Sequence, residues 1–240
     1  MDPRFFSASC VVWLRADSGI TLNGGTVSAW ADQSGRSNDL SQSTASQQPT
    51  WTQSGLNGEP ELSFDGVDDV LTGPSFFGLL SAADSWMTVA VCRDWTWGGS
   101  TAHNTGRAVL GAPSGGGGYF NQTMLSQAGG GPGGGFYNGS AHKTAKAAAA
   151  GSQGAALVWS MRNESGDLTV RVNGADGTTV SGAGSVQSQA TTLAVGHGTG
   201  SGTSTAFWDG AISEVLIFDG ALAAVEVAAL EGYLFARYGV

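Results

Sequence analysis

The stretch Gly210-Ala211-Ile212-Ser213-Glu214-Val215-Leu216-Ile217-Phe218 decides the fold of this chain. Successive side chains of a strand point to opposite faces, and here both faces are apolar. The apolar residues are Ile212, Leu216 and Phe218 on one face and Val215 and Ile217 on the other. A strand that is apolar on both faces lies inside a layered structure, with something covering each face. We therefore expect a central strand here.

An amphipathic helix is expected directly after this strand, over residues 222–238. Apolar residues recur there at the three-or-four spacing of one helix face, at Leu222, Val225, Ala229, Leu230, Tyr233, Leu234 and Tyr238. Gly239 stands where a helix end prefers a left-handed residue. Ala223 stands three residues before Glu226, where a complete capping box has Ser or Thr, which costs about 1 kcal/mol. The pattern predicts a helix docked onto a sheet.

The composition is typical of an all-β protein. The 240 residues include 39 Gly, only 12% are charged, and short apolar runs alternate with segments rich in Gly, Ser, Thr and Asn. The length suits one β-sandwich or barrel as well as two small domains, and we expect a single domain over residues 1–240. No apolar run approaches the roughly 18 residues that a membrane-spanning helix needs, so membrane insertion is not expected.

The charge of the chain excludes nucleic acid as an expected partner. The net charge is −9, and the only two lysines are Lys143 and Lys146, so there is no basic stripe to bind a phosphate backbone. The start Met1-Asp2-Pro3-Arg4 leads into a strand-like run without the pattern of a signal peptide. Either a signal sequence has been removed, or the protein reaches its destination without one, as virion proteins do when the cell lyses. We expect an extracellular location or a place in a virion.

Residues 94–154 form a long Gly-rich region that we expect to be irregular loops. Long irregular loops in a compact domain are either disordered or functional. Aromatic residues punctuate this region, and exposed aromatics beside polar side chains are typical of a binding surface. The candidate ligand-binding residues are Trp95, Trp97, Tyr119, Asn121, Tyr137, Asn138 and Trp208. The alternatives are that these aromatics anchor the loops or are buried against a partner subunit.

Four stretches together resemble the laminin-G-like modules of the concanavalin A-like lectin and glucanase superfamily. They are Trp13-Leu14-Arg15-Ala16 with Trp30-Ala31-Asp32-Gln33-Ser34-Gly35, Leu62 to Asp69, Val170-Arg171-Val172-Asn173-Gly174, and Gly210 to Phe218 with its helix. The resemblance covers nearly the whole chain. It implies two antiparallel sheets packed as a jelly-roll sandwich, and the helix completes the expected fold.

The resemblance implies a setting but leaves the function open, because such modules occur in very different proteins. Modules similar to this chain occur in bacterial surface proteins and in the virions of bacterial viruses. The expected function is a non-catalytic module on the exterior of a larger assembly, such as a bacteriophage virion accessory protein that recognises a host-surface glycan. The alternative is a purely structural protein whose loops bind neighbouring virion subunits or further copies of the chain in a homo-oligomer.

The carboxylates argue against catalysis and suggest one metal site. Retaining glycosidases need two carboxylates about 5 Å apart, and the nearest pair here, Glu59 and Glu61, flanks Pro60 without a third acid. The densest acidic cluster is Asp65, Asp68 and Asp69. Its oxygen ligands suit calcium, whereas the favoured alternative is that these carboxylates cap backbone amides in a turn. Apart from such a calcium ion, no cofactor is expected.

Overall fold

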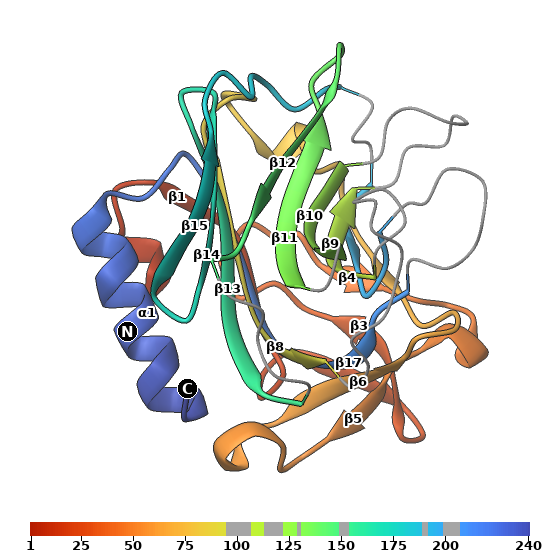
Figure 1. Cartoon of the computed structure of the whole chain (residues 1–240). Helices are drawn as coiled ribbons and strands as arrows, with labels where there is room; N and C mark the ends of the chain where they lie inside the picture. Colours follow the sequence, from red (N-terminus) through yellow and green to blue (C-terminus); the bar gives the residue numbers. More distant parts are fainter. Residues whose placement is uncertain (95–106, 113–121, 129–130, 149–153, 189–191, 199–206) are drawn as a thin grey trace.

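The structure is a computed structural model that describes residues 1–94, 107–112, 122–128, 131–148, 154–188, 192–198 and 207–240. Strands dominate it, and one long helix follows the last strand (Figure 1). The first strands are β1 (Ser9–Arg15), β2 (Ile20–Asn23), β3 (Thr26–Trp30), β4 (Leu40–Ser41), β5 (Thr50–Thr52), β6 (Glu61–Asp65), β7 (Leu71–Thr72) and β8 (Trp86–Asp94). The next are β9 (Ala108–Ala112), β10 (Gln122–Ala128), β11 (Gly131–Tyr137), β12 (His142–Lys146), β13 (Ala156–Glu164), β14 (Asp167–Val172), β15 (Ala175–Val180), β16 (Ala194–Val195) and β17 (Asp209–Asp219), before helix α1 (Ala224–Tyr238).

The strands form the two antiparallel layers of a sandwich. One layer runs β15-β14-β13-β8-β17, and the far edge of β17 is shared by β1 and β6. The other layer runs β12-β11-β10-β9-β16-β7-β4-β3-β2. Strand β5 pairs with both β3 and β6 and joins the layers at one end. The predicted all-β jelly-roll sandwich with a C-terminal helix is confirmed.

Strand β17 is the central element of the first layer, as its sequence predicts. It pairs with β8 along nearly its whole length, and all residues from 210 to 218 are buried. One detail of the predicted pattern is wrong. Ile212 packs in the core between the sheets with Val215 and Ile217, whereas Leu216 faces the helix. The pairing of β17 with β8 shifts its register between Ile212 and Glu214, which is a β-bulge. A bulge moves the residues before it to the opposite face of the sheet.

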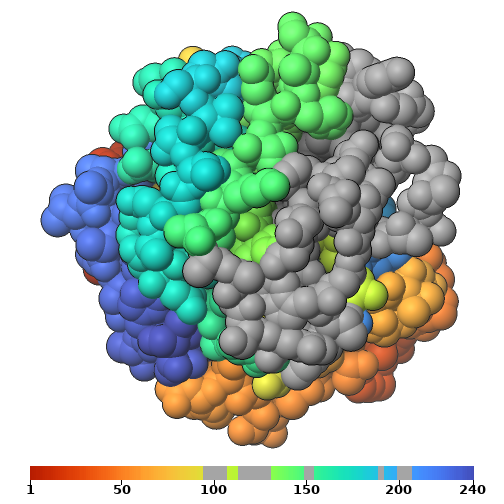
Figure 2. All heavy atoms as spheres, in the orientation of Figure 1, coloured from red at the N-terminus to blue at the C-terminus, as the bar shows by residue number. Residues whose placement is uncertain are grey.

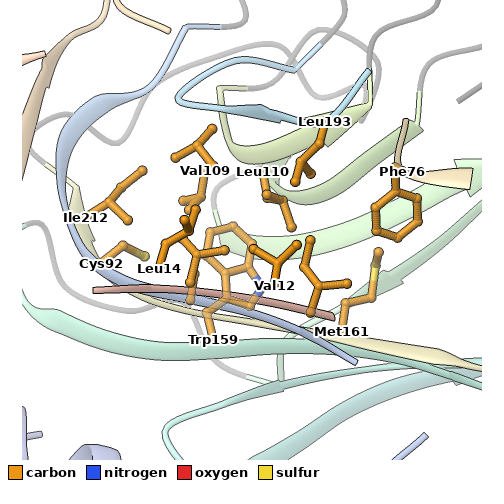
Figure 3. Close-up of a cluster of buried hydrophobic side chains, with 14 of the residues drawn as sticks. Val12, Leu14, Phe76, Cys92, Val109, Leu110, Trp159, Met161, Leu193 and Ile212 are labelled. Carbon is orange, nitrogen blue, oxygen red and sulfur yellow. The ribbon is translucent and has the colours of Figure 1, made fainter. Parts of the chain in front are cut away.

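Two hydrophobic cores lie on the two faces of this layer. The core between the sheets joins side chains of β1, β8, β13 and β17 to those of β9 and the segment before β16, as Figure 3 shows for Trp159, Val109 and Leu193. The second core lies under helix α1, which covers the outer face of the same layer (Figure 1). In the space-filling view, the helix (blue) adjoins the residues around β14 (teal) (Figure 2). Both predicted covers of the central strand are therefore present. Within the described residues, no helix is long and apolar enough to cross a membrane.

Helix α1 begins two residues later than expected. Ala223 is the N-cap residue, with extended φ and ψ, and Glu226 accepts its backbone N–H at 3.0 Å. Only this half of a capping box is present, because an alanine side chain cannot accept a hydrogen bond. Gly239 ends the helix at φ 69°, as predicted. Val225 is 76% exposed, so its predicted place on the buried face is wrong.

The expectation of irregular loops over residues 94–154 is wrong for the described parts. They form β9 to β12, and the Gly-rich run at 131–135 lies in strand β11. Strand β11 pairs with β10 on one side and β12 on the other. A Cβ added at Gly135 would collide with the carbonyl oxygen of Lys143, so glycine here permits a close approach of two backbones.

Candidate functional site

Most of the predicted ligand-binding residues lie outside the described residues. This applies to Trp95, Trp97, Tyr119 and Asn121. The structure describes the other three, Tyr137, Asn138 and Trp208, and each has a different environment.

Tyr137 and Asn138 lie together at the end of strand β11. The Tyr137 ring is partly exposed and lies 5.3 Å from the ring of His142, its partner across the β11–β12 pair. The Asn138 side chain accepts hydrogen bonds from the backbone N–H groups of Ser140 and Ala141 and donates one to the carbonyl of Ala183. Asn138 therefore shapes the turn, and Tyr137 is the partly exposed aromatic of this pair.

Trp208 is a core residue and not a surface aromatic. Its side chain is fully buried, and its ring lies 6.5 Å from that of Trp159 in the core between the sheets. The sequence places Trp208 beside a Gly-rich segment, but strand β17 begins at the next residue and draws it into the sandwich. The prediction that Trp208 belongs to an exposed ligand-binding set is wrong.

The acidic cluster forms as predicted. Single carboxylate oxygens of Asp65, Asp68 and Asp69 lie within 4.8 Å of one another. Asp65 accepts the backbone N–H groups of Val67 and Asp68, and Asp69 accepts the N–H of Asp65, so the cluster caps a turn. Burial, together with the nearby Asp65 and Asp68 carboxylates, raises the pKa of Asp69 to about 6. Capping accounts for these contacts, and calcium binding stays a prediction.

The two glutamates nearest to a glycosidase pair are held by different arginines. Glu61 is buried at the start of β6 and forms an ion pair with Arg93 of β8. Glu59 forms an ion pair of 2.7 Å with Arg237 near the end of helix α1. Each carboxylate therefore has a structural partner that joins two elements of the fold.

A surface pocket of about 270 Å³ lies at the β1–β2 turn and is lined entirely by described residues. We call it the Trp51 pocket. Its lining residues are Ala16, Asp17, Ser18, Gly19, Ile20, Leu22 and Trp51. Ile20 and Trp51 also pack against the core between the sheets, which makes them a fixed wall. Leu22 lies on strand β2 and is 46% exposed.

The turn that forms one side of the Trp51 pocket is held by two indole groups. Trp30 donates its Nε1–H to the carbonyl of Arg15 at 2.9 Å, and Trp51 donates its own to the carbonyl of Ala16 at 2.9 Å. Gly19 closes the turn at φ 74°, where a Cβ would collide with Gln33 and Ala31. Two buried or half-buried tryptophans thus fix consecutive carbonyls, and the turn has little freedom to move.

Asp17 is the only charged residue that lines the Trp51 pocket. Its Oδ2 accepts hydrogen bonds of 2.5 Å from both Arg15 and Arg237. No hydrogen bond within the described residues involves its Oδ1. Burial alone would raise the pKa of Asp17, but the two guanidinium groups outweigh it and hold the pKa below its ordinary value. The carboxylate is therefore ionised at neutral pH, with one oxygen oriented and the other able to accept hydrogen bonds.

This pocket combines an aromatic wall, aliphatic side chains and one oriented acceptor. Mostly apolar linings with a few fixed polar groups are typical of small-molecule sites. Sequence reasoning missed it because Trp51 and Asp17 are 34 positions apart in the chain and belong to no motif. The only local signal is the Asp17-Ser18-Gly19 turn after a strand, which is typical of many surface turns.

Comparisons with known proteins show the fold. No protein-family model matches the chain, and no curated protein matches it. Among solved structures it is similar to domain 4 of AbnA, a GH43 extracellular arabinanase from Geobacillus stearothermophilus, in complex with arabinotriose. The TM-score is 0.68, with 14% identity over 93% of this chain and 98% of that domain.

Two further structures are similar over most of this chain. The binding domain of Paraclostridial Mosquitocidal Protein 1 has a TM-score of 0.66 at 11% identity, over 94% of this chain and 52% of that one. Trypanosoma rangeli sialidase in complex with the inhibitor DANA has a TM-score of 0.61 at 16% identity, over 94% of this chain and 33% of that one. The chain thus spans about half of the toxin binding domain and a third of the sialidase. At these identities, the likeness confirms the β-sandwich and goes no further.

Proposed function

We propose that this chain is a non-catalytic binding module that recognises a glycan on the surface of a host bacterium. One observation carries the proposal: this chain is similar in fold to an arabinanase domain that was solved in complex with arabinotriose, and the similarity covers 98% of that domain. That structure supports a sugar as the ligand of a module of this size and architecture. The pocket beside Trp51, with its apolar wall and oriented carboxylate, supports the same ligand class.

The proposed setting is the exterior of a larger assembly, as an accessory protein of a bacteriophage virion. The resemblance of four sequence stretches to laminin-G-like modules supports this setting. The net charge of −9, with only two lysines, keeps such a protein soluble and away from nucleic acid. A purely structural role, in which loops bind neighbouring subunits, is the alternative outcome of the test below.

The proposal of a module without hydrolytic activity rests on the ion pairs of Glu59 and Glu61. A retaining glycosidase needs one carboxylate as nucleophile and one as acid/base across a shared substrate site. Glu61 is buried against Arg93, and Glu59 is bound by Arg237. We expect no release of reducing ends from glycans. Release that is lost in Glu59→Gln or Glu61→Gln would show an enzyme instead.

The binding proposal is tested on the purified chain with a panel of bacterial surface polysaccharides and with arabinotriose. Calorimetry and immobilised-glycan binding should give saturable binding by the monomer. The oligomeric state is measured in parallel by light scattering. A chain that binds no glycan and forms multimers would overturn the glycan proposal and favour the structural role.

A further inference from the structure

The Trp51 pocket has the chemistry of a site for one sugar ring. We propose that it binds a single neutral ring at the end of a glycan chain, an inference that rests on the proposed function. It assigns the site to a turn between β1 and β2 together with β5, and not to the Gly-rich region.

The size of the pocket limits the ligand to one ring. Pockets for drug-sized ligands enclose about 300–1,000 Å³. The Trp51 pocket, at about 270 Å³, lies just below this range. An oligosaccharide would leave most of its rings outside. A terminal ring can enter while the rest of the glycan extends into solvent, so the pocket suits a chain end.

The wall of the pocket matches the apolar face of a sugar ring. Trp51, Ile20 and Leu22 supply it, and the first two are held from behind by the core. The C–H groups of one face of a sugar ring can pack on an indole, as other apolar groups do. Leu22 is 46% exposed on an edge strand, although most strand leucines of the described residues are fully buried. A ligand in the pocket would cover it.

The polar side of the pocket selects neutral ligands with hydroxyl donors. Asp17 Oδ1 can accept a hydroxyl, and hydrogen bonds to an ionised acceptor are roughly twice as strong as neutral ones. Since Arg15 and Arg237 are bound to Oδ2, they orient the carboxylate without lining the pocket. No cation among the described residues lines the pocket, so a sugar acid would lose water from its carboxylate there without gaining an ion pair, which disfavours it.

The rigidity of the pocket favours binding without rearrangement. The indole N–H groups of Trp30 and Trp51 fix the turn through the carbonyls of Arg15 and Ala16. Ser18 adds a hydrogen bond of 3.1 Å to Gln33, which itself bonds to Ala31 on the next segment. A site that is already ordered avoids the cost of ordering side chains on binding. One ring makes few contacts, so we expect dissociation constants of about 1 mM.

The test is a titration of the ¹⁵N-labelled full chain with monosaccharides, followed by the indole and backbone amide signals. The neutral probes are L-arabinose, D-galactose, D-glucose and L-rhamnose, and the acidic probe is N-acetylneuraminic acid. The Trp51 indole signal is assigned with Trp51→Phe. We expect at least one neutral sugar to shift the signals of Trp51 and Gly19 saturably, and the acidic sugar to leave them unchanged.

Three variants then separate the pocket from the rest of the molecule. Asp17→Asn should weaken binding of the neutral sugar by at least about tenfold. Leu22→Ala changes a partly exposed residue, so the chain should fold normally while binding weakens by a few-fold. The matched control is Asp176→Asn, because Asp176 also bonds to an arginine, at 2.5 Å, but lies outside the pocket. This control should bind as the parent chain does.

The outcomes distinguish this inference from the proposed function. If the chain binds a polysaccharide and the Asp17→Asn and Leu22→Ala variants bind it equally well, the Trp51 pocket is not the sugar site. The proposed glycan-binding function would still stand. Equal shifts with the acidic sugar would overturn the selection for neutral rings. If neither polysaccharide nor monosaccharide binds, both proposals fall.

Discussion

Glu214 and Tyr238 are joined by a buried hydrogen bond of 2.8 Å, which the tyrosine hydroxyl donates to Oε2 of the carboxylate. The other oxygen of Glu214 accepts the indole N–H of Trp13 at 2.7 Å. Burial raises the pKa of Glu214, whereas these two hydrogen bonds favour its ionised form. The contact connects the last turn of helix α1 to the middle of β17. The helix is therefore oriented by polar contacts as well as by its apolar face.

Tyr238→Phe should lower the free energy of unfolding by about 1–3 kcal/mol, because it leaves a buried carboxylate oxygen without a partner. The measurement is urea unfolding at constant pH. Tyr233→Phe is the matched control, since the Tyr233 hydroxyl accepts a longer hydrogen bond, 3.3 Å, from Arg237 and its side chain is only partly buried. Equal losses in the two variants would show that the bond to Glu214 has no special weight.

Leu230→Ala should lower the free energy of unfolding by about 2–5 kcal/mol, because Leu230 is 1% exposed in the core under helix α1. Thermal and urea unfolding measure the change. Val225→Ala provides the comparison on the same helix: Val225 is 76% exposed, and its truncation should change stability by no more than about 0.5 kcal/mol. A small effect at Leu230 would contradict the docking of the helix.

Ala223→Ser should raise the free energy of unfolding by up to about 1 kcal/mol. Ala223 has the extended φ and ψ of an N-cap, and Glu226 already accepts its N–H, so a serine hydroxyl completes the box. Ala224→Ser places the same side chain one residue later, inside the helix, and should bring no gain. Stabilisation by both variants would mean that the effect is not capping.

Asp69 and His197 should give opposite pH dependences of stability. Burial raises the pKa of Asp69 to about 6. Its contribution to the free energy of unfolding is therefore fully present below pH 3.8 and is lost as the pH rises through 6. Burial lowers the pKa of His197 to about 4, so its contribution is present above pH 6.5 and is lost as the pH falls through 4. Between pH 6.5 and pH 4, acidification therefore strengthens one contribution and weakens the other.

Asp69→Asn removes the contribution that grows on acidification. This variant should lose more stability than the parent chain between pH 6.5 and pH 4, as measured by urea unfolding at each pH. His197→Gln should lose less than the parent chain over the same range. Parallel pH profiles for all three proteins would contradict the burial of both groups as the cause.

Local sequence patterns predict the elements whose neighbours in space are also neighbours in sequence. The β13–β14 hairpin is an example, because two apolar runs, 156–161 and 168–172, flank the polar segment 163–167, and Ser165 and Gly166 adopt positive φ at the turn. Helix α1 is another, since its face can be read from the spacing of Leu230, Leu234 and Tyr238. These patterns work because they depend on the backbone periods of 2 and 3.6 residues.

The Gly-rich strand β11 could not be predicted in this way. Strand β11 contains Gly133, Gly134 and Gly135, which have no side chain to alternate and low intrinsic strand propensity. Their strand conformation comes from pairing with β10 and β12. The bulge in β17 is a similar case, because the faces of Ile212 and Leu216 follow from the register with β8.

The sequence by itself determined the sandwich, its central strand and the helix that covers it, because apolar periodicity specifies which faces must leave water. The tertiary structure decided which aromatics are buried and which line a pocket. Trp208 and Trp51 are alike in the sequence, because each follows a segment rich in small polar residues. Yet Trp208 is fully buried, whereas Trp51 forms a pocket wall with Asp17. The reason is that exposure depends on which distant segments pack over a side chain, and no local pattern records that.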